Sequence, residues 1–191
     1  MKAKFTDSCE ISVPKDGFFR MNGFRSFLNK SLGVELIEQC STPLVVCATD
    51  LDNCCPVQWR EGAIAERVMA SCSIPIVFQP VKIDGLNYVD GGVLHNLPAW
   101  AIRDDCDYLI GINCSPMVKK NTYKGTLLDV AQRSYMLMAK TNAIADMHLC
   151  DLVIETKSIA DMHVFNMHQK ELVFRSGYKA ARDAIKKAGL V

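Results

Sequence analysis

The stretch ASCSIPIVFQPVKIDGLNYVDGGVLHNLP, residues 70–98, decides the fold. Its pattern predicts the end of a helix and then two strands joined by an Asp-Gly pair, which is typical of hairpin turns. Asp90 ends the second strand and precedes two glycines. Because glycine adopts backbone angles that side chains forbid, we expect Gly91 and Gly92 to form a sharp turn that presents the Asp90 carboxylate. An acid at such a junction is a candidate active-site group.

Outside this stretch, apolar runs of strand length alternate with segments of helical period. The run 44–51 is almost continuously apolar, which suits a strand covered on both faces of a parallel sheet. We therefore predict an α/β fold with a mainly parallel central sheet, in a single domain spanning residues 1–191. The other expected strands are 57–59, 108–114 and 152–155, with a strand or irregular arm over 5–19; the expected helices are 24–32, 61–72, 98–103, 126–149 and 170–188.

Composition excludes some functions. The chain has 191 residues, 49% hydrophobic and 23% charged, with a net charge of +1, so neither nucleic acid nor an anionic membrane is indicated as an obligatory partner. No signal peptide follows Met1 and no apolar run is long enough to span a membrane. Together with nine irregularly spaced cysteines, which we interpret as reduced, this predicts a cytoplasmic protein, either free or peripheral at membranes.

Four short motifs, in order and closely spaced, resemble those of the patatin-like phospholipases. The likeness is close over residues 43–114 and weaker toward the C-terminus. That family hydrolyses acyl esters with a serine–aspartate dyad and without a metal or organic cofactor. The resemblance implies that Asp90 is the dyad base and that the substrate is a phospholipid or other acyl ester. The motifs are PLVVCATDL at 43–51, ASCSIP at 70–75, YVDGGV at 88–93 and NLP at 96–98.

The family's serine is missing from these motifs. The chain contains neither a G-x-S-x-G nucleophile elbow nor a G-G-x-R loop, and Ser71 and Ser73 have no flanking glycines. The resemblance therefore implies the C-terminal part of a three-layer α/β/α sandwich, lacking its N-terminal strands and elbow, with the nucleophile supplied from upstream of Met1. We expect the chain alone to be inactive as a phospholipase A type ester hydrolase, and to self-associate through an uncovered sheet edge.

Other interpretations of the same residues stay open. Asp90 alone could form an Asx turn, with its carboxylate bonding backbone amides. His95 suits a turn histidine better than a triad member, and His163 with His168 lacks the spacing for a metal site, so no metal is assigned. The whole chain could also be a non-catalytic scaffold used for binding or assembly. A nucleotide-binding domain is disfavoured, because no strand opens into a glycine-rich phosphate loop.

Overall fold

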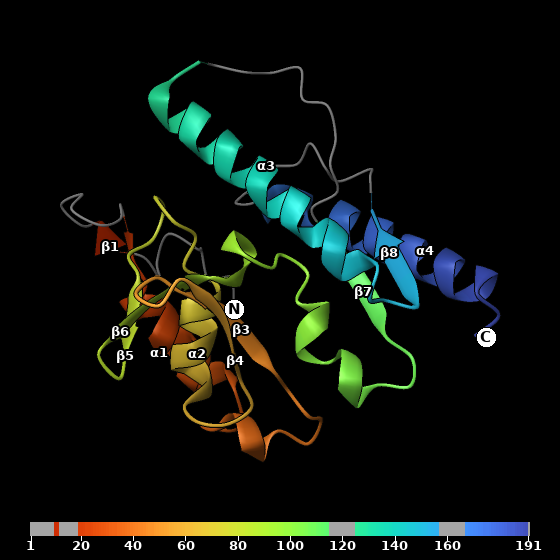
Figure 1. Ribbon diagram of the computed structural model, residues 1–191, viewed down its shortest axis with the longest axis horizontal. Coiled ribbons are helices and arrows are strands. Elements are labelled where there is room, and N and C mark those ends of the chain that lie inside the picture. The colour runs from red at the N-terminus through yellow and green to blue at the C-terminus, as the bar shows by residue number, and fades with distance from the viewer. Residues whose placement is uncertain (1–9, 12–18, 115–124, 157–166, 191) are drawn as a thin grey trace. The chain divides into compact units, whose positions relative to one another are not determined.

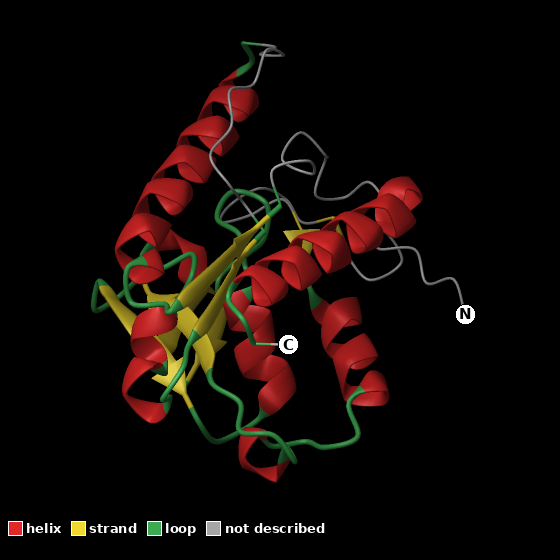
Figure 2. Cartoon of the chain, turned by 90° about the vertical axis from the view of Figure 1, so that its right-hand side faces the viewer, coloured by secondary structure: helices red, strands yellow, loops and turns green. Residues whose placement is uncertain are grey.

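The computed structural model describes residues 10–11, 19–114, 125–156 and 167–190. The chain forms two compact units, residues 1–95 and 96–191, and each is described by itself. Figure 1 labels their elements and Figure 2 distinguishes helices from strands by colour. The first described elements, β1 (Glu10–Ile11) and β2 (Phe19–Arg20), pair antiparallel; the rest of the expected arm over 5–19 lies outside the described residues.

The first unit is built on a four-stranded sheet in the order β4 (Cys55–Trp59), β3 (Val46–Asp50), β6 (Leu86–Asp90) and β5 (Val81–Ile83). Every neighbouring pair in it is antiparallel, so the prediction of a mainly parallel central sheet is wrong. The apolar run was misleading because β3 is a central strand and is buried along its whole length. A central antiparallel strand covered on both faces has the same composition as a parallel one.

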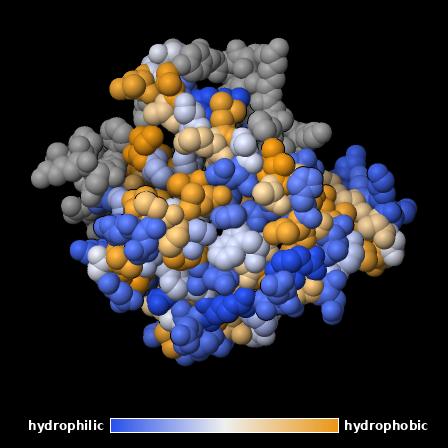
Figure 3. Space-filling view, in the orientation of Figure 1, coloured by the Kyte–Doolittle hydropathy of each residue, from blue (hydrophilic) through white to orange (hydrophobic). Residues whose placement is uncertain are grey.

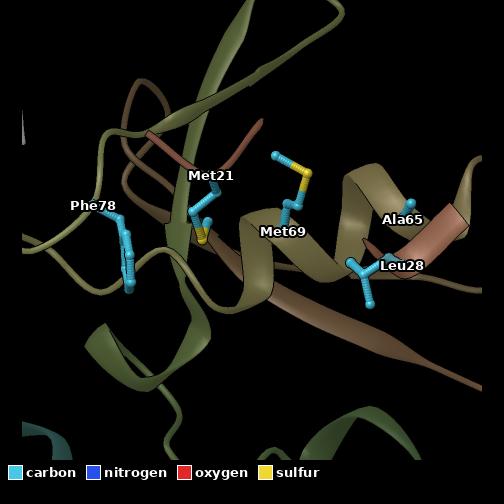
Figure 4. Close-up of a cluster of buried hydrophobic side chains, with 5 residues drawn as sticks. All are labelled: Met21, Leu28, Ala65, Met69 and Phe78. Carbon is cyan, nitrogen blue, oxygen red and sulfur yellow. The ribbon is translucent and has the colours of Figure 1, made fainter. Parts of the chain in front are cut away.

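Two helices build the core beside this sheet. Helices α1 (Asn22–Ser31) and α2 (Ile64–Ser71) have apolar residues at helical spacing, as the sequence predicted, and they contact each other. Helix α2 also packs on β3, where Ala48 and Ala70 share a buried cluster. The side chains of the cluster between the two helices, shown in Figure 4, are Met21, Leu28, Ala65, Met69 and Phe78.

The second unit contains a parallel pair, β7 (Ile110–Asn113) and β8 (Leu152–Glu155), joined through helix α3 (Leu127–Met147). The helix expected over 126–149 forms as α3, and the Thr126 hydroxyl caps it by accepting a hydrogen bond from the Asp129 N–H at 3.1 Å. Helix α4 (Lys170–Lys187) packs against β8. The chain therefore has both α and β elements, but its parallel pairing is confined to two strands among the described residues.

The helix expected over residues 98–103 does not form. Only two short 3-10 turns, Ala99–Ala101 and Arg103–Asp105, occupy this part of the chain. The Trp100 backbone N–H donates to the buried Asp146 carboxylate at 3.1 Å, and the Arg103 guanidinium donates to the Cys106 carbonyl oxygen at 2.6 Å. The backbone itself closes i to i−3 bonds, from the Ala101 N–H to the Pro98 carbonyl oxygen and from the Ile102 N–H to the Ala99 carbonyl oxygen, each at 3.2 Å, in place of the i to i−4 ladder of an α-helix.

Candidate active-site aspartate

Asp90 is fixed at the end of β6 from two sides. It lies opposite Ala48 of β3 in the antiparallel register, and its N–H donates to the Ser73 carbonyl oxygen at 3.0 Å. Ser73 follows the C-terminal end of α2. Strand and helix end together place the aspartate backbone, so this position depends on packing within the first unit and not on the Asp-Gly-Gly sequence alone.

The turn after Asp90 is an Asx turn. One carboxylate oxygen, Oδ1, accepts a hydrogen bond from the Gly92 N–H at 2.7 Å and caps the 3-10 turn Gly91–Val93. The His95 N–H closes the turn by donating to the Gly91 carbonyl oxygen at 2.8 Å. The structure gives Oδ2 no hydrogen-bond donor among the described residues, so only one of the two carboxylate oxygens is used for the turn.

The reason for the glycines differs from the expected one. Neither Gly91 nor Gly92 has a positive φ, so the prediction that the turn needs forbidden backbone angles is wrong. Gly91 is instead required by close approach, because a Cβ there would lie 3.1 Å from the Cys47 carbonyl oxygen of β3. The absence of a side chain at Gly91 lets the turn pack directly on the neighbouring strand's backbone.

Burial makes Asp90 a stronger base than a surface aspartate. The residue is half-buried, and desolvation raises the pKa of its carboxyl group above the usual range, while the hydrogen bond from Gly92 partly opposes this. A carboxylate with a raised pKa takes up a proton more readily from a neighbouring hydroxyl. The site therefore holds a group suited to general-base work.

Two groups that interact with Asp90, the Cys72 thiol and the residue Ser73, do not supply a nucleophile. Cys72 is exposed, yet desolvation by nearby protein atoms raises the pKa of its thiol, and the charge of Asp90 raises it further. A thiol shifted in this direction stays protonated and is poorly nucleophilic. Ser73 is fully buried and its hydroxyl donates to the Met69 carbonyl oxygen at 2.8 Å, as expected for a packing serine.

A second strand-end aspartate was not singled out from the sequence. Asp50 ends β3, is buried, and its Oδ1 accepts from the backbone N–H groups of Asp52 and Asn53, each at 2.9 Å. Its Oδ2 accepts from the Asn53 side-chain amide at 2.8 Å. These hydrogen bonds, with that side-chain amide first, lower the pKa of Asp50. Its Asp-x-x-Asn spacing after a strand was the signal that could have identified this turn.

Neither of the other sequence candidates is brought into a site. Within the described part of the chain, no group of three or more histidine, cysteine, aspartate or glutamate residues could hold a metal. His163 lies outside the described residues, whereas His168 lies in the 3-10 turn Met167–Gln169, which precedes α4. The backbone of His95 belongs to the turn after Asp90.

Comparison with known proteins identifies the family of this chain. The family model for the patatin-like phospholipases matches residues 2–102, and the chain belongs to that family. It is also 32% identical over 87 residues to an uncharacterised NTE family protein of Mycobacterium bovis and to one of Mycobacterium tuberculosis. Each match covers 46% of this chain but only 24% of the relative. In the part of the chain that the structure describes, no helix is long and apolar enough to cross a membrane.

Proposed function

We propose that this chain supplies the dyad aspartate, Asp90, of a lipid acyl hydrolase of the phospholipase A type. The substrates would be phospholipids, lysophospholipids or other acyl esters. The observation that carries the proposal is the Asp90 carboxylate itself, held at a strand end with a raised pKa and one oxygen without a donor among the described residues. Membership of a phospholipase family supports the same chemistry.

The serine would come from sequence upstream of Met1, since the 191 residues contain no G-x-S-x-G segment. In the proposed reaction, Asp90 Oδ2 accepts the proton of that serine hydroxyl while the serine Oγ attacks the ester carbonyl carbon. The carbon–oxygen bond to the alcohol breaks, and the alcohol leaves with the proton from Asp90. Water then attacks the acyl-serine by the same route, releasing the fatty acid and restoring the serine.

The upstream segment also offers a reason for an exposed sheet face. Strands β7 and β8 form a two-stranded sheet, and Ile110 and Ile112 of β7 are exposed on one face. An additional strand and its helix would cover such a face. We propose that without it the chain self-associates through an uncovered edge of this two-stranded sheet, next to that face. Size-exclusion chromatography tests this: a stable monomer contradicts the proposal, and elution as a dimer or larger species supports it.

A non-catalytic scaffold is the second candidate. It is favoured by the Asx turn, because the Gly92 hydrogen bond gives Asp90 a structural role whether or not a serine is near. It is also favoured by the lack of a nucleophile motif in these 191 residues. In that case the surface around Asp90 would bind a ligand or another protein without cleaving it.

Fluorophosphonate labelling followed by intact and peptide mass measurement separates the candidates. We expect no adduct on the 191-residue chain, and an adduct on a serine of the same chain extended upstream along its reading frame. Asp90→Asn is the informative variant, because the asparagine Oδ1 can still accept the Gly92 hydrogen bond but the side chain cannot take up a proton. Asp84→Asn, at the exposed hairpin turn, is the matched control.

An extended chain that never labels would support the scaffold. An adduct within the 191 residues that is lost in Asp90→Asn would show that the serine lies in this chain, contrary to the proposal. Labelling of the extended chain that Asp90→Asn leaves unchanged would remove Asp90 from the dyad.

A further inference from the structure

Helix α4 exposes an aromatic pair. Phe174 and Tyr178 lie one turn apart with 68% and 63% of their surface exposed, and their rings stack with centroids 6.4 Å apart. Stacking them on each other leaves most of both rings in water, which is costly for side chains of this size. Seven residues of α4 are partly buried. Five of them lie on another side at helical spacing, and two, Ala181 and Ile185, follow the aromatic pair along its own face; the five are Val173, Ser176, Gly177, Ala180 and Ala184.

The same helix concentrates positive charge. It contains six lysine and arginine residues and two acidic ones, a net charge of +4, whereas the whole chain has a net charge of +1. Arg182 lies one helical turn after Tyr178, and Arg175 and Lys179 flank the aromatic pair; all three are exposed. One of the two acids, Glu171, is already paired with Arg175 at 2.8 Å.

We propose that this face of α4, defined by Phe174, Arg175, Tyr178, Lys179 and Arg182, docks on an anionic lipid surface. Aromatic side chains insert at the level of lipid headgroups, and lysine and arginine residues beside them attract anionic headgroups. The charge favours such a surface over a neutral one, and the exposed rings favour it over a purely ionic partner. Figure 3 shows hydrophilic residues bordering apolar ones in the region of α4.

This inference extends the proposed lipid hydrolysis, because an enzyme acting on membrane lipids must reach their surface, but its test measures binding alone. Sedimentation with phosphatidylcholine vesicles, with and without phosphatidylserine, gives the affinity. We expect the 191-residue chain to bind only the vesicles that contain phosphatidylserine, and more weakly as salt is raised. The double variants Phe174→Gln/Tyr178→Gln and Lys179→Glu/Arg182→Glu should each weaken binding by about tenfold or more.

Two matched controls separate this face from general apolar or ionic adhesion. Leu51→Gln removes an exposed apolar side chain and Lys82→Glu reverses an exposed charge, both in the first unit, and neither should change binding. A Phe174→Trp reporter, read against the wild-type signal of Trp59 and Trp100, should shift its emission to shorter wavelength when phosphatidylserine vesicles are added. Circular dichroism checks that every variant is folded.

Three results would overturn the proposal: no binding to phosphatidylserine vesicles, binding that both double variants leave intact, or reporter emission that is already blue-shifted without vesicles. The last would mean that protein, either a second copy or another segment, covers this face. Hydrolysis of a soluble short-chain ester by the extended chain reports on the proposed function separately, because it needs no lipid surface.

Discussion

Asp50 and Asp90 end neighbouring antiparallel strands of one sheet, yet the pKa values of their carboxyl groups are shifted in opposite directions. Hydrogen bonds to both oxygens lower the pKa of Asp50 and fix the turn that joins β3 to β4. Asp90 receives one hydrogen bond, from Gly92, and desolvation raises its pKa. A strand-end aspartate is therefore not a functional group by position. The number of donors around its oxygens decides whether it holds a turn or can act as a base.

The largest expected effect is on activity and concerns Asp90. In the upstream-extended chain, Asp90→Asn should lower ester hydrolysis by about 10²–10⁴-fold, the range for losing a general base, with the Gly92 hydrogen bond kept. Steady-state kinetics on a soluble acyl ester measures it. Asp84→Asn should leave kcat within experimental error. If Asp90→Asn kept full activity, the donor count around a carboxylate would have no bearing on catalysis here.

The second effect is on stability and separates Asp50 from Asp90. Asp50→Ala leaves two backbone N–H groups and the Asn53 amide without their acceptor, so it should lower the melting temperature by several degrees. Asp90→Ala removes a single accepted hydrogen bond together with a desolvated charge and should cost less. Thermal unfolding followed by circular dichroism compares them. Equal losses would show that the two carboxylates stabilise the sheet alike.

A third effect concerns the backbone beneath Asp90. Gly91→Ala would place a Cβ 3.1 Å from the Cys47 carbonyl oxygen, and relief requires the turn to move off β3. We expect a loss of about 1–3 kcal/mol in the free energy of unfolding, as for other overpacked sites. Urea denaturation measures it. Gly33→Ala is the control, since no heavy atom lies within 4 Å of that Cβ and its φ is not positive, and the same loss there would refute the close-approach argument.

Short sequence patterns predicted those elements whose deciding residues lie close together in the chain. The Asp84-Gly85 turn adopts φ of 50° and 91°, and the expected hairpin of β5 and β6 forms around it. The beginnings of α3 and α4 likewise lie within one residue of the positions expected from the sequence, 126 and 170. Asp90 was located because the residues of its motif are contiguous in the sequence.

Long-range contacts explain what the sequence did not reveal. Strand direction in the larger sheet depends on pairing between β3 and β6, which composition does not encode. The helix expected over 98–103 is replaced by two 3-10 turns, and there the Trp100 backbone N–H donates to the carboxylate of Asp146, 46 residues further along the chain. The role of Gly91 depends on the Cys47 carbonyl of another strand. In each case the deciding partner is distant in sequence.

The smallest effect is the pH dependence of stability, and its sign differs between the two aspartates. The pKa of Asp50 is lowered on folding, so its ionised form stabilises the fold at neutral pH, and this contribution is lost as pH falls through the folded pKa. The pKa of Asp90 is raised, so the fold binds its proton more tightly than the unfolded chain does, and stability falls as pH rises through the folded pKa. At neutral pH, Asp90→Asn should therefore be as stable as the wild type or more so, and Asp50→Asn less stable.

Denaturant titrations of the wild type and the two variants, from acidic to neutral pH, give the difference in free energy of unfolding between each variant and the wild type. Acidification should shrink the Asp90→Asn gain first and the Asp50→Asn loss only at lower pH, because the folded pKa of Asp50 is the lower of the two. If the two differences had the same sign, desolvation would not be the dominant influence on Asp90, and the contrast between the carboxylates would fail.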